Sequence, residues 1–334
     1  MPGQLPPSAR SLVDFFSRSL SSFQSSSSKL QVICTAAAAT THQHGEGHGP
    51  PAAIPPRARP RTLIVLDSSF NPPTRAHLRM ATSAIHDLTR NKGQKLGTLR
   101  LLLLLSVNNA DKAPKPAAFD KRLAMMWAFA RDLQQSLRGA QGPLLGEEGE
   151  EPPPSVDLGL STLPYFHEKS VAIAELGFYN GEGDGGDGRK MEQVFLVGYD
   201  TLIRIFNPKY YGPVEAISTE HAVAKATAMQ KALDPFFARS KLRVTMRTGD
   251  EWGNADEQKQ YLEDMLKAGG LSKVGGSEDW GSRIEMVEGR EVGADIISST
   301  YARAAAEEKD MDKLELMITL EVRWWIEQEA LYAQ

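Results

Sequence analysis

Short apolar runs alternate along the chain with segments whose apolar residues recur at helical spacing. Residues 63–66 and 101–105 are continuously apolar over the length of one strand, which is typical of strands buried on both faces of a parallel sheet. The alternation predicts an α/β fold. The pattern predicts further strands near 156–160, 194–197, 242–246 and 284–287, and helices at 78–88, 119–133, 171–176, 222–233 and 314–331.

The chain has 334 residues, and the continuous alternation of strands and helices favours one large domain at 61–334. Residues 1–34 are predicted to form an N-terminal helix and a short strand docked on it. Residues 35–60 are rich in alanine, histidine, glycine and proline, which predicts a disordered loop. Glycine-rich surface inserts are predicted at 138–155 and 181–190.

The segment after the first predicted strand is expected to form a tight polar turn and then a helix, an arrangement that is typical of phosphate-binding sites. Pro72 and Pro73 restrict the backbone before them, so a helix begins only after them. Thr74 is the predicted N-cap of that helix. His77 therefore falls in the first turn, where backbone N–H groups and the positive end of the helix dipole favour an anion.

Two motifs near opposite ends of the predicted domain carry a family resemblance. Ser69-Phe-Asn-Pro-Pro-Thr-Arg-Ala-His77 resembles the G-S-F-N-P-x-T-x-x-H segment of the nicotinamide mononucleotide adenylyltransferases, within the HxGH nucleotidyltransferase superfamily. Ile297-Ser-Ser-Thr-Tyr-Ala-Arg303 is similar to that family's I-S-S-T-x-x-R signature. The resemblance implies a Rossmann-like parallel sheet with helices on both faces. It also implies an enzyme that transfers the adenylyl group of ATP to nicotinamide mononucleotide, forming NAD and pyrophosphate.

The resemblance implies roles for the motif residues, with His77, Arg303 and Thr74 as the catalytic group. His77 would hydrogen-bond a phosphate oxygen where charge accumulates, and Arg303 would clamp the β and γ phosphates with its fork of donors. Thr74 would help to shape the cradle. The expected ATP-binding residues are Ser68, Ser69, Phe70, His77, Gly198, Asp200, Ser298, Ser299, Thr300 and Arg303.

Further candidates follow from junctions that resemble those of the family. Gly198 would let a ligand approach the backbone, and Asp200 would cap the following helix or accept a hydrogen bond from a ribose. The expected substrate-binding residues are Lys112, Arg122, Asp200, Arg247 and Trp252, and the substrate is nicotinamide mononucleotide or its nicotinic acid counterpart.

Ser68 departs from the pattern, because it stands where the family has glycine. The sequence predicts that Ser68 is the tightest point of the loop and that its side chain narrows the approach of the nucleotide. Two alternatives therefore stay open. One is an ATP-dependent nucleotidyltransferase or ATPase with another acceptor, and the other is a nucleotide-binding regulator without turnover. The Asp67-Ser-Ser-Phe70 form and the inserts look like the divergent fungal branch of the family.

Charge and cysteine content limit the partners and the compartment. A net charge of −4 gives no general reason to expect nucleic acid, and no apolar run approaches the roughly 20 residues that cross a bilayer. One cysteine, Cys34, excludes an intrachain disulfide and suits the cytoplasm or nucleus. The serine-rich start, with Arg10 and Arg18, also shares the composition of mitochondrial transit peptides. The oligomeric state, a homo-oligomer included, stays open.

Mg²⁺ is the expected cofactor and would enter with ATP. His42, His44 and His48 lie close together in the sequence, but no cysteine or aspartate accompanies them. Short histidine tracts in such loops are usually solvated, so the sequence predicts no metal site built by the chain.

Overall fold

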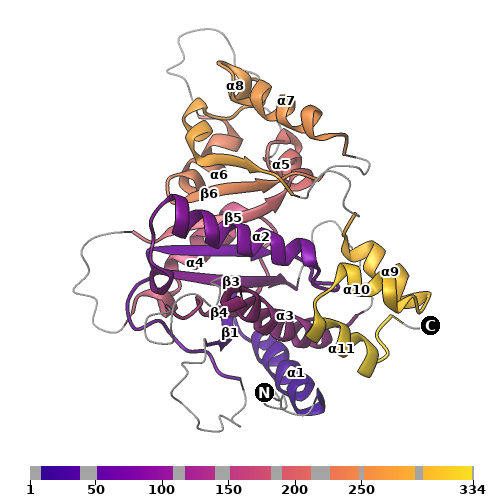
Figure 1. Ribbon diagram of the computed structural model, residues 1–334. Helices are drawn as coiled ribbons and strands as arrows, with labels where there is room; N and C mark the ends of the chain where they lie inside the picture. Colours follow the sequence, from indigo (N-terminus) through magenta and orange to yellow (C-terminus); the bar gives the residue numbers. More distant parts are fainter. Residues whose placement is uncertain are drawn as a thin grey trace. The chain divides into compact units, whose positions relative to one another are not determined.

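A computed structural model describes residues 9–37, 51–107, 117–139, 151–181, 190–211, 226–247, 252–289 and 296–332 (Figure 1). The chain divides into two compact units. The first unit comprises residues 1–164, 175–191 and 297–334, and the second unit comprises residues 165–174 and 192–296. The boundaries predicted from the sequence, at 1–34, 35–60 and 61–334, stay a prediction. Residues 38–50, 140–150 and 182–189, within the predicted loop and inserts, lie outside the described residues.

The first unit is built on four strands in the order β1, β4, β3, β2. β2 runs parallel to β3 and β3 parallel to β4, whereas β1 pairs antiparallel with β4. Leu63 and Leu103 have no exposed surface, as the continuous apolar runs predict for strands buried on both faces. The strands are β1 (Leu30–Ala36), β2 (Thr62–Asp67), β3 (Leu99–Ser106) and β4 (Val156–Ser161).

Helices of the first unit pack around a long helix, α3, which begins at Phe119 as predicted. The N-terminal helix α1 and the C-terminal helix α11 both pack beside it (Figure 1). Thr74 is the N-cap of α2, which confirms that prediction. The helices are α1 (Ala9–Ser25), α2 (Arg75–His86), α3 (Phe119–Gly139), α9 (Ser299–Glu307), α10 (Met311–Met317) and α11 (Leu320–Gln328), and the short turns are η1 (Asp87–Asn91), η2 (Leu96–Thr98) and η3 (Gly177–Tyr179).

The prediction of one closing helix at 314–331 is wrong. Ile318 has an extended backbone, so the segment divides into α10 and α11. The break is stabilised from α3, because Asp132 accepts a hydrogen bond of 3.0 Å from the N–H of Glu321 in the first turn of α11. Burial raises the pKa of the Asp132 carboxyl, and its hydrogen bonds oppose that rise.

A buried ion pair ties β1 to its neighbours. Arg100 on β3 donates to Asp157 on β4 at 2.6 Å, and the Thr35 hydroxyl on β1 donates to the same carboxylate at 2.7 Å. Burial raises the pKa of Asp157, while Arg100 opposes the rise. The neighbouring Cys34 is buried and free, and burial raises the pKa of its thiol. These bonds satisfy the charges that the strands bury.

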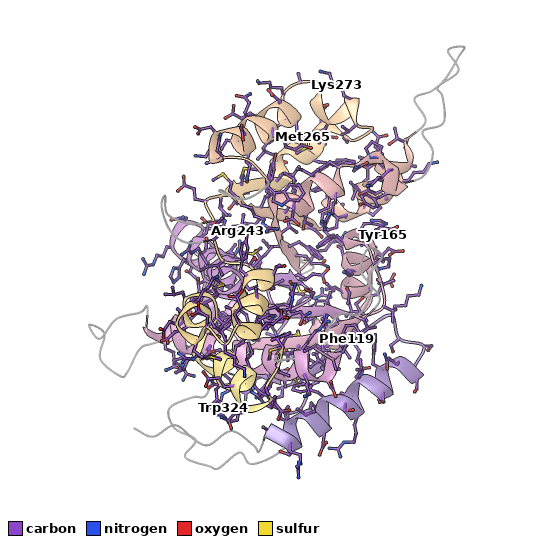
Figure 2. The ribbon with its side chains drawn as sticks, turned by 90° about the vertical axis from the view of Figure 1, so that its right-hand side faces the viewer. Phe119, Tyr165, Arg243, Met265, Lys273 and Trp324 are labelled. Carbon is purple, nitrogen blue, oxygen red and sulfur yellow. The ribbon has the colours of Figure 1, made fainter. Side chains whose placement is uncertain are left out.

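The second unit contains three parallel strands in the order β5, β6, β7. The helix predicted at 222–233 begins later, at Ala228, after a capping interaction of Thr227 with Gln230. Met265 on α7 and Lys273 on α8 mark this unit in Figure 2. The elements are α4 (Phe166–Glu175), β5 (Glu192–Gly198), α5 (Tyr199–Ile205), η4 (Pro208–Tyr211), α6 (Ala228–Phe237), β6 (Ser240–Thr245), α7 (Ala255–Leu266), α8 (Gly270–Lys273), η5 (Glu278–Arg283) and β7 (Ile284–Val287).

The predicted α/β class, with a Rossmann-like parallel sheet, is confirmed. In the described ranges, no helix combines the length and the hydrophobicity that a bilayer crossing requires.

Candidate active site

The loop that follows β2 turns at Phe70 and not at Ser68. Phe70 has a φ of 43°, in the left-handed region, and its side chain has no exposed surface. The prediction that Ser68 is the tightest point of the loop is therefore wrong. Ser68 continues the strand by donating its N–H to the carbonyl of Leu104 on β3 at 3.2 Å, and Ser69 beside it is exposed. Phe70 contributes a packed side chain, with its ring centroid 5.4 Å from that of His77.

His77 is held by both ring nitrogens. Its Nδ1 accepts the N–H of Thr74 at 3.0 Å and lies 2.9 Å from the Thr74 hydroxyl, while its Nε2 lies 3.0 Å from the Ser68 hydroxyl. Because a backbone N–H only donates, Nδ1 carries no proton, and the neutral ring carries its proton on Nε2. Burial lowers the pKa of His77 to about 4, so the ring is neutral at pH 7.

The second motif meets the first in the first unit. Ser298 is the N-cap of α9 and accepts the N–H of Tyr301 at 3.2 Å. The Ser299 hydroxyl then donates to the carbonyl of Pro72 at 2.8 Å, and Arg303 donates to the carbonyl of Asn71 at 2.6 Å. Thr300 accepts a second bond from the Arg303 guanidinium at 3.2 Å. Residues separated by 232 positions in the chain are thus in direct contact.

Asn71 joins three parts of the first unit. Its side-chain oxygen accepts the N–H of Ala117 at 2.9 Å and the hydroxyl of Tyr332 at 2.8 Å, while its carbonyl accepts Arg303. Burial raises the pKa of Tyr332, and Arg122 and Arg303 oppose the rise, so the phenol is protonated at pH 7. Sequence reasoning missed Tyr332, because no motif surrounds it.

Arg122 adds a second guanidinium to this neighbourhood. It donates to the carbonyl of Ala117 at 2.7 Å and lies 4.9 Å from the ring centroid of Phe119, which Figure 2 labels. Burial lowers the pKa of Arg122; Tyr332 opposes this, and the positive charge of Arg303 adds to it. The two guanidinium groups repel each other, and an anion near them would reduce that repulsion.

In the second unit, Gly198, Asp200 and Arg247 are neighbours. Gly198 is the N-cap of α5, so the prediction that Asp200 caps this helix is wrong. A Cβ on Gly198 would lie 2.7 Å from the Asp200 carboxylate, which shows that the glycine makes room for that side chain. Asp200 in turn accepts Arg247 at 3.2 Å.

A buried amide, Gln258 on α7, bonds the backbone of both Arg247 and Trp252. Gln258 has no exposed surface, accepts the N–H of Arg247 at 3.0 Å, and donates to the carbonyls of Arg247 and Trp252 at 2.6 and 3.2 Å. The sequence analysis missed Gln258, because no motif or helical periodicity distinguishes it from the other polar residues of α7.

The structure thus brings one group of predicted residues together in each unit. The first unit joins Ser68, Thr74, His77, Ser299, Thr300, Arg303 and Arg122, and the second joins Gly198, Asp200, Arg247 and Trp252. Lys112 lies outside the described residues. Among the described residues, no cluster of three histidine, cysteine, aspartate or glutamate side chains is arranged to hold a metal ion.

Comparisons with known proteins give one clear relative in sequence. A Schizosaccharomyces pombe protein named "Putative nicotinamide mononucleotide adenylyltransferase" is 32% identical over 263 residues, which cover 78% of this chain and 82% of that protein. No family model matches.

Solved structures of nicotinic acid mononucleotide adenylyltransferase from Plasmodium falciparum are similar at 12% identity. The aligned residues cover 81% of this chain and 97% of each Plasmodium falciparum chain. The TM-scores are 0.42 for the complex with NaAD and 0.43 for the complex with APC.

Proposed function

Because the chain belongs to the nicotinamide mononucleotide adenylyltransferase family, we propose that it transfers the adenylyl group of ATP to a pyridine mononucleotide. The preferred acceptor is nicotinamide mononucleotide, which gives NAD and pyrophosphate. Nicotinic acid mononucleotide is the second acceptor to be tested.

The contact between the two motifs is the observation that carries this proposal. Arg303 bonds the carbonyl of Asn71, and Ser299 bonds the carbonyl of Pro72, so the start of α9 lies against the loop before α2. A helix start offers N–H donors to an anion. The arrangement supports a site for the phosphates of ATP in the first unit.

The charges of this site suit phosphoryl chemistry. His77 is neutral and offers an N–H dipole, whereas Arg303 and Arg122 carry the positive charge. In the proposed step, an oxygen of the acceptor phosphate forms a bond to the α-phosphorus of ATP, and the bond from that phosphorus to the bridging oxygen breaks. Pyrophosphate takes the electron pair. The acceptor phosphate is already a nucleophile at pH 7, so positioning and charge neutralisation supply the catalysis.

We expect Mg²⁺ to enter with ATP. When bound, it would neutralise charge on the phosphates, and Arg303 and Arg122 would supply further positive charge from the chain. Our candidates for recognition of the acceptor are Asp200, Arg247 and Trp252, with Lys112 outside the described residues.

The test is to incubate the purified protein with MgATP and each pyridine mononucleotide in turn, and to measure the dinucleotide and pyrophosphate. We expect both products in equal amounts. A panel of other phosphate monoesters, and water alone, covers the alternative acceptors. Binding of ATP without release of pyrophosphate under any of these conditions would contradict the proposed function.

A matched pair of variants on α2 tests the role of His77. His77→Ala is expected to lower turnover at least about a hundredfold, the typical effect of removing a group that stabilises developing charge. His86→Ala changes the last residue of the same helix and is expected to leave turnover within about twofold.

A further inference from the structure

Ser68 lies beside the imidazole of His77, and the next residue of the loop, Ser69, is exposed. Ser68 follows β2 directly, at the carboxyl end of a parallel strand, where ligands of open α/β sheets commonly bind. Its hydroxyl is half-buried and lies 3.0 Å from Nε2 of His77. Any anion that approaches the imidazole through this nitrogen meets the hydroxyl first.

The direction of this hydrogen bond follows from the bonds on the other side of the ring. Nδ1 accepts the N–H of Thr74, so the proton of the neutral ring is on Nε2. Ser68 Oγ is therefore the acceptor, and its own hydrogen is available for a second bond. In the described part of the chain, His77 is the partner that the structure gives to this hydroxyl.

A hydroxyl that accepts one hydrogen bond becomes a stronger donor of the next, because the two bonds polarise each other. We propose that Ser68 is a catalytic residue that accepts the Nε2–H of His77 and donates its own hydrogen to a phosphate oxygen of the bound nucleotide. This inference rests on the proposed function. The sequence prediction places Ser68 among the ATP-binding residues with a side chain that narrows the approach of the nucleotide, and it assigns no hydrogen bond to the Ser68 hydroxyl.

We call the two successive hydrogen bonds, from His77 to Ser68 and from Ser68 to the phosphate, the relay. Three substitutions at Ser68 in the full-length protein distinguish this relay from steric obstruction by the Ser68 side chain. Ser68→Ala removes the hydroxyl and is expected to lower kcat/KM for MgATP at least about tenfold. Ser68→Thr keeps the hydroxyl and is expected to stay within about threefold of the parent. Ser68→Gly lacks the hydroxyl but also removes the side chain, so it is expected to fall with Ser68→Ala.

Two results would overturn the relay. Ser68→Ala with unchanged kcat/KM would show that the hydroxyl has no role, and a gain of turnover in Ser68→Gly and Ser68→Ala would show that it obstructs His77. Thr82→Ala removes a hydroxyl from α2 that bonds the carbonyl of Leu78, and it serves as the control with unchanged turnover. Melting temperatures of all variants identify any loss of folding.

Binding measurements distinguish failure of this inference from failure of the proposed function. Calorimetric titration with α,β-methylene-ATP requires no acceptor and no turnover. The relay predicts that Ser68→Ala binds the analogue about tenfold more weakly than the parent and that Ser68→Thr does not. Equal affinities of Ser68→Ala and the parent would overturn the relay alone. No binding by the parent would contradict both proposals.

The response of the His77 ring to the bound analogue gives a readout that a purely structural role of Ser68 does not move. In ¹⁵N-labelled protein, the relay predicts a protonated Nε2 in His77 whose chemical shift changes when the analogue binds. In Ser68→Ala the same nitrogen stays protonated, but it meets water or ligand directly, so its shift differs already without the analogue. An Nδ1-protonated ring in the parent would overturn the assignment of donor and acceptor.

Discussion

The two units hold their candidate residues by different kinds of bond. In the first unit, Arg303 donates to the carbonyl of Asn71 and to the Thr300 hydroxyl, which are neutral oxygens. In the second unit, Arg247 pairs with the carboxylate of Asp200. Neutral acceptors position a guanidinium without cancelling its charge, whereas a carboxylate cancels it.

From this difference we propose separate roles for the two groups of residues. An uncancelled charge attracts a triphosphate strongly, which suits the residues of the first unit for stabilising the reaction. A paired arginine interacts less with anions, which suits the second unit for selecting among acceptors. Four predictions test this comparison.

The largest effect is expected from Arg303. Arg303→Ala should lower kcat/KM at least about a hundredfold, because it removes a charged fork of donors from the proposed phosphate site. Arg303→Lys should recover only part of the loss, since a lysine keeps the charge without the fork. Steady-state kinetics with MgATP as the varied substrate measures both. Arg323→Ala, whose side chain on α11 pairs with Glu327, is the control. Equal kcat/KM values for Arg303→Ala and Arg323→Ala would contradict the proposed role of the first-unit residues.

The next effect concerns stability against pH in the two units. The pKa of His77 is lowered to about 4 from 6.5, so the unfolded chain binds more protons between these values. Stability from this group is therefore fully present above pH 6.5 and is lost as the pH falls towards 4. Between pH 7 and pH 5 the loss is about 1 to 2 kcal/mol, with allowance for the partial exposure of the ring.

Denaturant unfolding of the parent and of His77→Gln at pH 7 and pH 5 gives the free energy of unfolding at each pH. The loss of stability between the two pH values should be smaller in His77→Gln by the contribution of His77. His167 in the second unit is the comparison, because burial lowers its pKa while Glu168 opposes the shift. His167→Gln should change the pH dependence less than His77→Gln. A larger change for His167→Gln would contradict the stronger lowering of the pKa of His77.

A smaller effect is expected from Arg247. Arg247→Ala should raise KM for the pyridine mononucleotide about tenfold and leave kcat within about threefold, because it removes binding that is equal in ground and transition states. KM for MgATP should stay within about twofold. A fall in kcat as large as that of Arg303→Ala would show that both units contribute alike to the chemical step.

The smallest effect comes from two helix caps. Ser298 caps α9 and Asn254 caps α7, and each accepts one backbone N–H, from Tyr301 and Glu257. Replacement of either by alanine should cost about 1 kcal/mol of stability. Only Ser298→Ala should also lower turnover, because α9 begins within the second motif, which we propose binds the phosphates of ATP. Loss of turnover in Asn254→Ala would remove the distinction between the caps.

Local signals predicted the parts of the structure that local chemistry decides. Thr74 caps α2, and Phe119 begins α3, because capping and apolar periodicity depend on a few neighbouring residues. The break at Ile318 was missed, since a carboxylate from α3 stabilises it. Tyr332 and Gln258 were missed for the same reason. Each acts through contacts with residues far along the chain or on another element, and no periodicity encodes such contacts.

The motif residues of the candidate site were predicted from the sequence, but Tyr332 and Gln258 were not. The hydrogen bonds that join the two motifs in the first unit needed coordinates. The position of Ser68 was identified as a departure, yet the left-handed residue of the loop is Phe70. A glycine in a family pattern indicates either a backbone conformation that other residues avoid or a neighbouring group that leaves no room for a Cβ atom. Only coordinates distinguish these two reasons.

The antiparallel strand β1 has a consequence for any shortened form of the protein. β1 covers the outer side of β4, and Thr35 completes the shell around Asp157. A form without residues 30–36 would present β4 as an open edge, with unpaired backbone groups and a carboxylate that has lost one donor. In the full chain β1 takes this edge position, and the N–H of Thr35 on it donates to the carbonyl of Ala52. Because an unpaired edge is a template to which other chains add strands, the shortened form is expected to self-associate more readily than the full chain.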